Sequence, residues 1–158
     1  MNTFSEPGSA CQLPPGRWIG VDLGQKRVGL ALSDPTGTIA TALATVEYRG
    51  PVHLIGELRK YVKQTGAVGL VIGLPRRTDG SEGPEALEAR QAAGMIRRDL
   101  ALPVALWDER MTTRIAAQTL RESGMNSRNS RQVVDRVAAQ ILLQSYLDAH
   151  AAADHREV

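Results

Sequence analysis

The most constraining feature of this sequence is a change in its hydrophobic pattern near residue 50. Before that point, three short apolar segments follow one another with very short connections, at residues 18–24, 27–33 and 38–46. The two-residue link Gln25-Lys26 and the turn sequence Asp34-Pro35-Thr36-Gly37 predict an antiparallel meander of three strands. After that point, helical and strand-like segments alternate, which is typical of parallel strands joined by crossover helices.

The second part of the chain supplies two more strands and four helices. The apolar runs predict strands at 68–72 and 103–107, and helices at 51–65, 84–100, 112–123 and from Ser130 onward. Right-handed crossovers then give an α/β fold, a mixed five-stranded sheet with helices on both faces. With strands numbered along the chain, the expected order is 3-2-1-4-5. We expect one domain over 17–150, a flexible N-terminal tail over 1–16 and a C-terminal tail over 151–158.

Composition excludes several classes of protein. The 158 residues contain one cysteine, Cys11, so neither an intramolecular disulfide nor a cysteine-based zinc site can form. No signal peptide or membrane-spanning run is recognisable, so we expect a cytoplasmic protein. Aromatic residues make up only 4% of the chain, which argues against a single-strand binder built on stacking platforms. Nearly all basic residues are arginine, which indicates either anion binding or a GC-rich genome.

Acidic residues stand at three positions where a ligand could bind. Asp22 interrupts an apolar strand, where an acid is costly unless it is hydrogen-bonded or binds something. Asp108 and Glu109 directly follow the last strand, where parallel sheets place ligands, although they could simply favour the next helix dipole. Asp135 lies near the start of the last helix and could equally face solvent or pair with a neighbouring arginine.

Taken together, these acids have the chemistry of a divalent-cation site. Carboxylate oxygens without cysteine or paired histidine suit Mg²⁺ or Mn²⁺ better than zinc. Carboxylates from different elements that converge on one spot are the parts of a two-metal phosphodiester hydrolase. In the expected sheet, Gly73 ends the strand between those of Asp22 and Glu109, and its missing side chain would leave room for ions.

Basic residues flank these acids and are candidates for contacts to nucleic-acid phosphates. Loop positions Arg76, Arg77 and Arg128 are the strongest candidates, since several of the others could form a solvated helix face. The full predicted nucleic-acid-binding set, which includes one threonine, is Lys26, Arg27, Arg76, Arg77, Arg110, Thr112, Arg114, Arg128 and Arg131.

Four sequence blocks resemble the YqgF/RuvX family. They are Gly20-Val21-Asp22-Leu23-Gly24-Gln25-Lys26-Arg27-Val28-Gly29, Gly73-Leu74-Pro75 with Asp79-Gly80, Asp108-Glu109-Arg110-Met111-Thr112-Thr113, and Val134-Asp135-Arg136-Val137-Ala138-Ala139. The resemblance implies an RNase H-like fold and a nuclease, described for this family as a pre-16S rRNA nuclease and earlier as a Holliday junction resolvase. It also implies that Asp22, Glu109 and Asp135 are the catalytic, metal-binding acids, with Asp108 in reserve.

At two places the sequence departs from the family pattern, and these places affect which family properties can be expected of this chain. Arg76 and Arg77 follow Pro75, where other members more often carry Leu-Asn or a similar pair, so substrate preference could differ. The fourth acid of some junction resolvases would fall at Ala138 or Ala139 and is therefore absent.

Several readings remain open at this point. The first is a Mg²⁺- or Mn²⁺-dependent nuclease of structured nucleic acid, acting on the 5′ end of pre-16S rRNA or, alternatively, on branched DNA in recombination and repair. The second is a phosphotransferase, because residues 20–29 also resemble the phosphate-binding hairpin of actin-like kinases, but those enzymes need two such domains. The third is a non-catalytic, ribosome-associated nucleic-acid-binding factor. A homodimer would suit a four-way junction and a monomer an RNA end.

Overall fold

The computed structural model describes residues 4–5, 16–77, 79–109 and 127–156, with side chains over 16–77, 79–109 and 134–150. The expected meander is formed by β2 (Trp18–Leu23), β3 (Arg27–Ser33) and β4 (Ala40–Glu47). Antiparallel pairs join β2 to β3 and β3 to β4. The turn between β3 and β4 is closed by a 3.0 Å hydrogen bond from the Gly37 amide to the Asp34 carbonyl.

The second part adds two parallel strands to the other side of β2. They are β5 (Gly69–Leu74), which pairs with β2, and β6 (Val104–Asp108), which pairs with β5. The sheet order is β1-β6-β5-β2-β3-β4, which confirms the expected order 3-2-1-4-5 for the five main strands. The sixth strand, β1 (Phe4–Ser5), pairs in parallel with β6 and lies in the segment expected to be a tail. Two residues are too few to carry a periodic pattern, which is why this strand could not be predicted.

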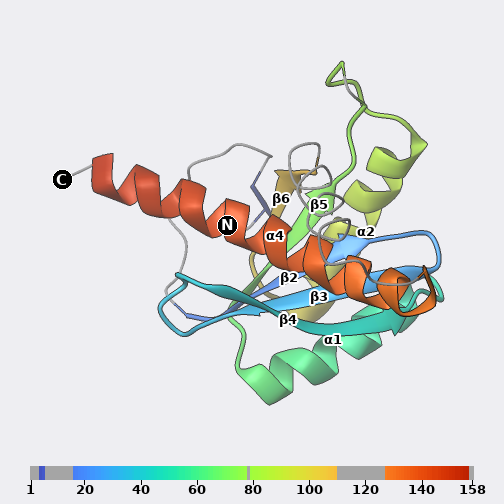
Figure 1. Cartoon of the computed structure of the whole chain (residues 1–158), viewed down its shortest axis with the longest axis horizontal. Helices are drawn as coiled ribbons and strands as arrows, with labels where there is room; N and C mark the ends of the chain where they lie inside the picture. Colours follow the sequence, from blue (N-terminus) through green and yellow to red (C-terminus); the bar gives the residue numbers. More distant parts are fainter. Residues whose placement is uncertain (1–3, 6–15, 78, 110–126, 157–158) are drawn as a thin grey trace.

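Helices cover both faces of the sheet, as expected. α1 (Pro51–Thr65) begins at a proline and ends at Gly66, whose φ of 72° is the left-handed conformation that glycine tolerates best. α2 is Pro84–Leu100 and α4 is Ser127–Arg156. Figure 1 shows α4 crossing one face of the sheet, with α1 on the other side. The expected helix at 112–123 lies outside the described residues.

Two hydrophobic clusters hold these layers together. Ile19 and Val21 pack with α1 and α2, whereas Trp18 packs with α4 residues such as Leu143 and Tyr146. Successive strand residues point to opposite faces, so the alternation along β2 sorts its side chains between the two clusters.

The ends of α4 differ from the expectation. The helix begins at Ser127, three residues before the predicted start, and it continues through Arg156, inside the predicted C-terminal tail. Serine at 127 suits a helix start as well as Ser130 does. The alanine-rich stretch after residue 148 has high helix propensity, which explains why the helix continues. No helix within the described residues has both the length and the apolarity to cross a membrane.

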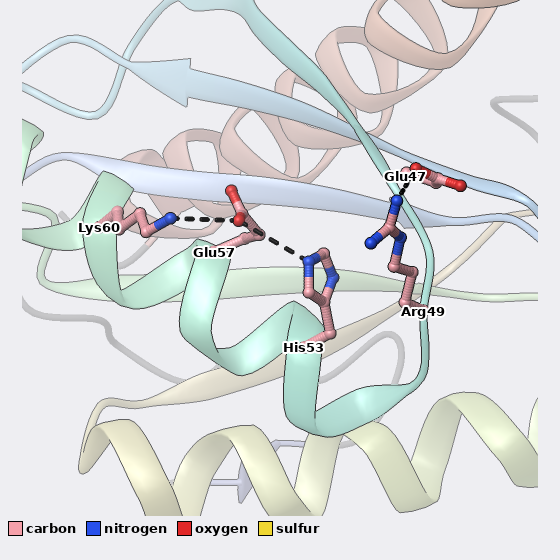
Figure 2. A network of polar contacts seen from close by, with 5 residues as sticks. All are labelled: Glu47, Arg49, His53, Glu57 and Lys60. Carbon is pink, nitrogen blue, oxygen red and sulfur yellow. Dashed lines mark hydrogen bonds and ion pairs between the residues drawn. The ribbon is translucent and has the colours of Figure 1, made fainter.

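A small polar network lies on α1 and the preceding segment (Figure 2). Glu57 pairs with Lys60 at 3.3 Å and lies 3.9 Å from His53 Nε2. Arg49 pairs with Glu47 at 2.9 Å, and both side chains are 65% exposed. Exposed pairs of this kind contribute little to stability.

Candidate active site

Asp22 and Glu109 meet on the face of the sheet that α4 covers. Alternation along β2 places Asp22 on the same face as Trp18, and alternation along β6 places Glu109 on the face of Ala105 and Trp107. A side-chain hydrogen bond joins Glu109 to Asp22. Asp108, the reserve candidate, lies on the opposite face with Leu106 by the same alternation, and its charge acts on Glu109.

Burial and like charges change the acidity of both carboxyl groups. Burial raises the pKa of Glu109 to about 10, and the hydrogen bond to Asp22 and the charges of Asp22 and Asp108 act in the same direction. Burial also raises the pKa of Asp22, with a smaller contribution from the Asp135 charge, while the hydrogen bond from Glu109 opposes the rise. The hydrogen bond between the two groups raises the pKa of Glu109 and lowers that of Asp22. Both shifts are those of a protonated Glu109 carboxyl that donates to an Asp22 carboxylate.

Asp135 approaches this pair from α4. Gly29 is the cross-strand partner of Asp22, and a Cβ on Gly29 would overlap the backbone carbonyl of Asp135. A glycine at this position of β3 is therefore what lets the helix come close enough for Asp135 to influence Asp22. The Asp135 side chain is only 19% exposed, and its Oδ2 accepts a 2.9 Å hydrogen bond from Arg27 Nε.

Gly73 keeps space open beside the two paired acids. A Cβ at this position of β5 would lie 3.1 Å from Glu109 Oε1 and 3.2 Å from Leu142 Cδ2, which is tighter than ordinary packing allows. The all-oxygen donor set of these buried carboxyl groups fits a hard divalent cation. Among the described residues, however, no three acidic, histidine or cysteine side chains surround one common point. Asp22 and Glu109 are together, while Asp135 is bound by Arg27.

The predicted phosphate-binding residues differ in how accessible their side chains are. Lys26 is exposed in the turn after β2, and Arg77 is exposed in the loop after β5. Arg76 is 25% exposed and lies 3.5 Å from Glu82, so its charge is partly neutralised. Arg110, Thr112 and Arg114 lie outside the described residues; Arg128 and Arg131 belong to α4, but their side chains are not described.

Solved structures with a similar fold define the class of this domain. Thermus thermophilus RuvC, solved in complex with a Holliday junction substrate, matches with a TM-score of 0.52 at 14% identity, over 86% of this chain and 96% of that one. The yeast mitochondrial Holliday junction resolvase Ydc2 matches with a TM-score of 0.53 at 11% identity, over 90% of this chain and 82% of that one. The fold is therefore RNase H-like.

Sequence comparison identifies the family within that class. The model of the RuvX family, described as Holliday junction resolvase, matches residues 16–149. A "Putative pre-16S rRNA nuclease" of Pelotomaculum thermopropionicum is 45% identical over 134 residues, which are 84% of this chain and 87% of the relative. A protein of the same name from Moorella thermoacetica is 42% identical over 132 residues, which are 84% of this chain and 94% of the relative. This chain belongs to the RuvX family.

Proposed function

We propose that this chain is a nuclease that hydrolyses phosphodiester bonds in structured nucleic acid, with the 5′ end of pre-16S rRNA as its substrate. The observation that carries the proposal is the buried, hydrogen-bonded pair of Asp22 and Glu109 in a member of the RuvX family. Curated relatives at 42–45% identity carry the name of pre-16S rRNA nuclease. We expect it to act in the cytoplasm.

Asp22, Glu109 and Asp135 would hold Mg²⁺ or Mn²⁺. When bound, a pair of such ions supplies Lewis-acid chemistry to the attacking water and the leaving oxygen. The protein's own part begins with the Glu109 carboxyl, which must give up its proton before both acids of the pair can act as anionic ligands. Asp135 must also share with the cation the carboxylate that Arg27 holds.

The basic residues would seat the substrate backbone. Lys26 and Arg77 are exposed near the edge of the sheet that carries the acids, where a phosphate could reach them. Arg27 and Arg76 could contribute only in competition with their acidic partners, Asp135 and Glu82. The other candidates for the same role are Arg110, Thr112, Arg114, Arg128 and Arg131.

Cleavage of branched DNA is a second candidate, favoured by the description of the family itself. A symmetric homodimer would match the symmetry of a four-way junction, whereas a monomer would suit an RNA end.

The deciding experiment compares a pre-16S rRNA fragment with a four-way DNA junction, each with Mg²⁺, with Mn²⁺ and with chelator. We expect metal-dependent cleavage of the rRNA precursor, and loss of cleavage in Asp22→Asn with nucleic-acid binding retained. Asp99→Asn, an exposed acid at the end of α2, is the matched control and should cleave normally. Preferential cleavage of the junction would support the second candidate. Binding without cleavage under every condition would support a non-catalytic factor instead.

A further inference from the structure

Two adjoining cavities lie beside the turn that follows Asp22. One, of ≈ 360 Å³, lies between Gly24 and Gln25 of that turn, Tyr48, and the first turns of α2. The other, of ≈ 500 Å³, lies between Lys26, Arg27 and the end of β4. Gln25 and Tyr48 line both, so the two cavities meet at these residues.

The smaller cavity has the composition of a site for a flat, polar-edged ring. Leu23, Pro75 and Ala89 provide apolar walls, and Tyr48 provides an aromatic side chain. The polar groups are the Gln25 amide and the carboxylates of Glu85 and Glu88. Small-molecule sites commonly combine apolar walls with a few polar groups that orient the ligand.

The two glutamates are available as hydrogen-bond acceptors. Both are exposed, and neither forms an ion pair with any residue that the structure describes. Burial raises the pKa of the Tyr48 hydroxyl, and the charge of the nearby Glu88 carboxylate acts in the same direction. Two carboxylates repel a phosphate, so this cavity suits a base and not the sugar-phosphate backbone.

The larger cavity is lined by two basic side chains, Lys26 and Arg27, and by one carboxylate, Glu47, which Arg49 pairs. Lys26 is exposed, and it has no ion-pair partner within the described part of the chain. Arg27 lines the same cavity and contacts Asp135. A phosphate can therefore lie here while its base enters the neighbouring cavity. Gly24 is two residues beyond Asp22, so their Cα atoms are at most about 7 Å apart.

We propose that the smaller cavity binds one nucleobase of the substrate, whose phosphate lies in the larger cavity beside Lys26, and that it selects bases with an exocyclic amino group. This inference rests on the proposed function. Carboxylates accept hydrogen bonds from the cytosine N4 amino group, and uracil carries a carbonyl oxygen at the same position, which the glutamates would repel. Recognition of one unstacked base at its edge is the usual way in which proteins read single-stranded RNA.

The test compares two probes that differ in that one group. Fluorescently labelled oligo(C) and oligo(U) of equal length are titrated into the full-length Asp22→Asn protein, which is expected to bind without cleaving. We expect oligo(C) to bind about tenfold tighter, the effect of roughly one good hydrogen bond to a charged acceptor. Glu85→Gln with Glu88→Gln should bring the ratio close to one without weakening oligo(U), because a neutral amide no longer repels the uracil carbonyl. Tyr48→Phe should keep the ratio, and Tyr48→Ala should weaken both probes.

Glu57→Gln, which removes a charge on α1 outside both cavities, is the matched control and should keep the ratio. Equal affinity for the two probes in the Asp22→Asn protein, or a ratio that survives the double glutamate substitution, overturns the subsite. If the unaltered protein nevertheless cleaves nucleic acid, the proposed function stands without it. If the chain neither binds nor cleaves any nucleic acid, the proposed function fails, and the subsite fails with it.

Discussion

Arg27 Nε donates a 2.9 Å hydrogen bond to Oδ2 of Asp135 across 108 positions of sequence. The pair joins the first residue of β3 to α4 at the point where Gly29 lets the helix come closest to the sheet. The arginine side chain is 33% exposed and the aspartate 19%, so water screens this pair only in part. In the metal-free protein, Arg27 therefore supplies the counter-charge for the third proposed acid.

Removal of that counter-charge should destabilise the metal-free protein. We expect Arg27→Ala to lower the free energy of unfolding by about 1–2 kcal/mol, since a partly buried carboxylate loses a charged donor. Urea unfolding in the presence of chelator measures this change. Arg49→Ala breaks an exposed ion pair of the same 2.9 Å length (Figure 2) and should cost at most about 0.5 kcal/mol. In an Asp135→Asn background, the Arg27 substitution should cost less. Equal losses for Arg27→Ala and Arg49→Ala would contradict this role.

Glu109 should make the metal-free protein less stable as the pH rises. Burial and the neighbouring charges raise the pKa of Glu109 from 4.5 to about 10. The folded state therefore keeps a proton that the unfolded chain releases, and stability present below pH 4.5 is lost progressively as the pH rises toward 10.

Glu109→Gln cannot ionise and should remove this dependence. We expect the variant to be more stable than the parent at pH 8 by on the order of 2 kcal/mol, with a smaller difference at pH 6. Thermal or urea unfolding in chelator at several pH values measures the difference. Asp34 provides a control of opposite sign, since hydrogen bonds from Ile39, Thr36 and Thr38 lower its pKa and its contribution is lost only in acid. A difference in the free energy of unfolding between Glu109→Gln and the parent that stays constant from pH 6 to pH 8 would refute the expectation.

The order of the five main strands and two of the helices could be predicted because local patterns encode them. Apolar runs bounded by Gly and Pro place β5 and α2 with errors of only one or two residues. Asp22 could be singled out because an acid in an apolar strand conflicts with its surroundings. Glu109 lies beside Asp22, to which it is hydrogen-bonded, and the expectation that Glu109 and not Asp108 is the ligand stays a prediction.

Contacts between distant elements could not be predicted in this way. The sequence suggested Arg27 as a substrate contact, and no local pattern indicates a partner 108 residues away. The cavity around Tyr48 likewise combines a turn, the segment after β4 and the start of α2, each unremarkable by itself. The roles of Asp22, Glu109 and Asp135 in catalysis stay predictions.

The close approach of α4 to β3 depends on Gly29. A Cβ there would overlap the Asp135 carbonyl, a backbone atom that cannot rotate away. We expect Gly29→Ala to destabilise the protein by about 3 kcal/mol or more, or to displace α4. Gly56→Ala in α1 is the matched control, because nothing lies within 4 Å of its Cβ. In a helix interior it should stabilise by about 0.5–1 kcal/mol. Thermal unfolding of both variants measures the contrast, and similar melting temperatures would show that α4 does not pack against Gly29 as described.

Adjacent arginines in the loop after β5 should differ in their contribution to nucleic-acid binding. Glu82 is bound by Arg90 at 2.7 and 2.9 Å and lies 3.5 Å from Arg76, so Arg76 shares its carboxylate. Arg77 is exposed and lies against Gly83 at the start of α2, where the helix dipole is positive. Its charge is therefore the more available of the two to a phosphate.

We expect Arg77→Ala to weaken binding uniformly across sequences and to reduce the salt dependence of the affinity by about one phosphate contact. Arg76→Ala should change the salt slope less, because the Glu82 carboxylate already offsets part of the charge of Arg76 in the parent protein. Titrations of the Asp22→Asn protein with a labelled oligonucleotide at several salt concentrations measure both slopes. If Arg76→Ala lowers the slope as much as Arg77→Ala does, the ion pair with Glu82 does not hold Arg76 away from the substrate.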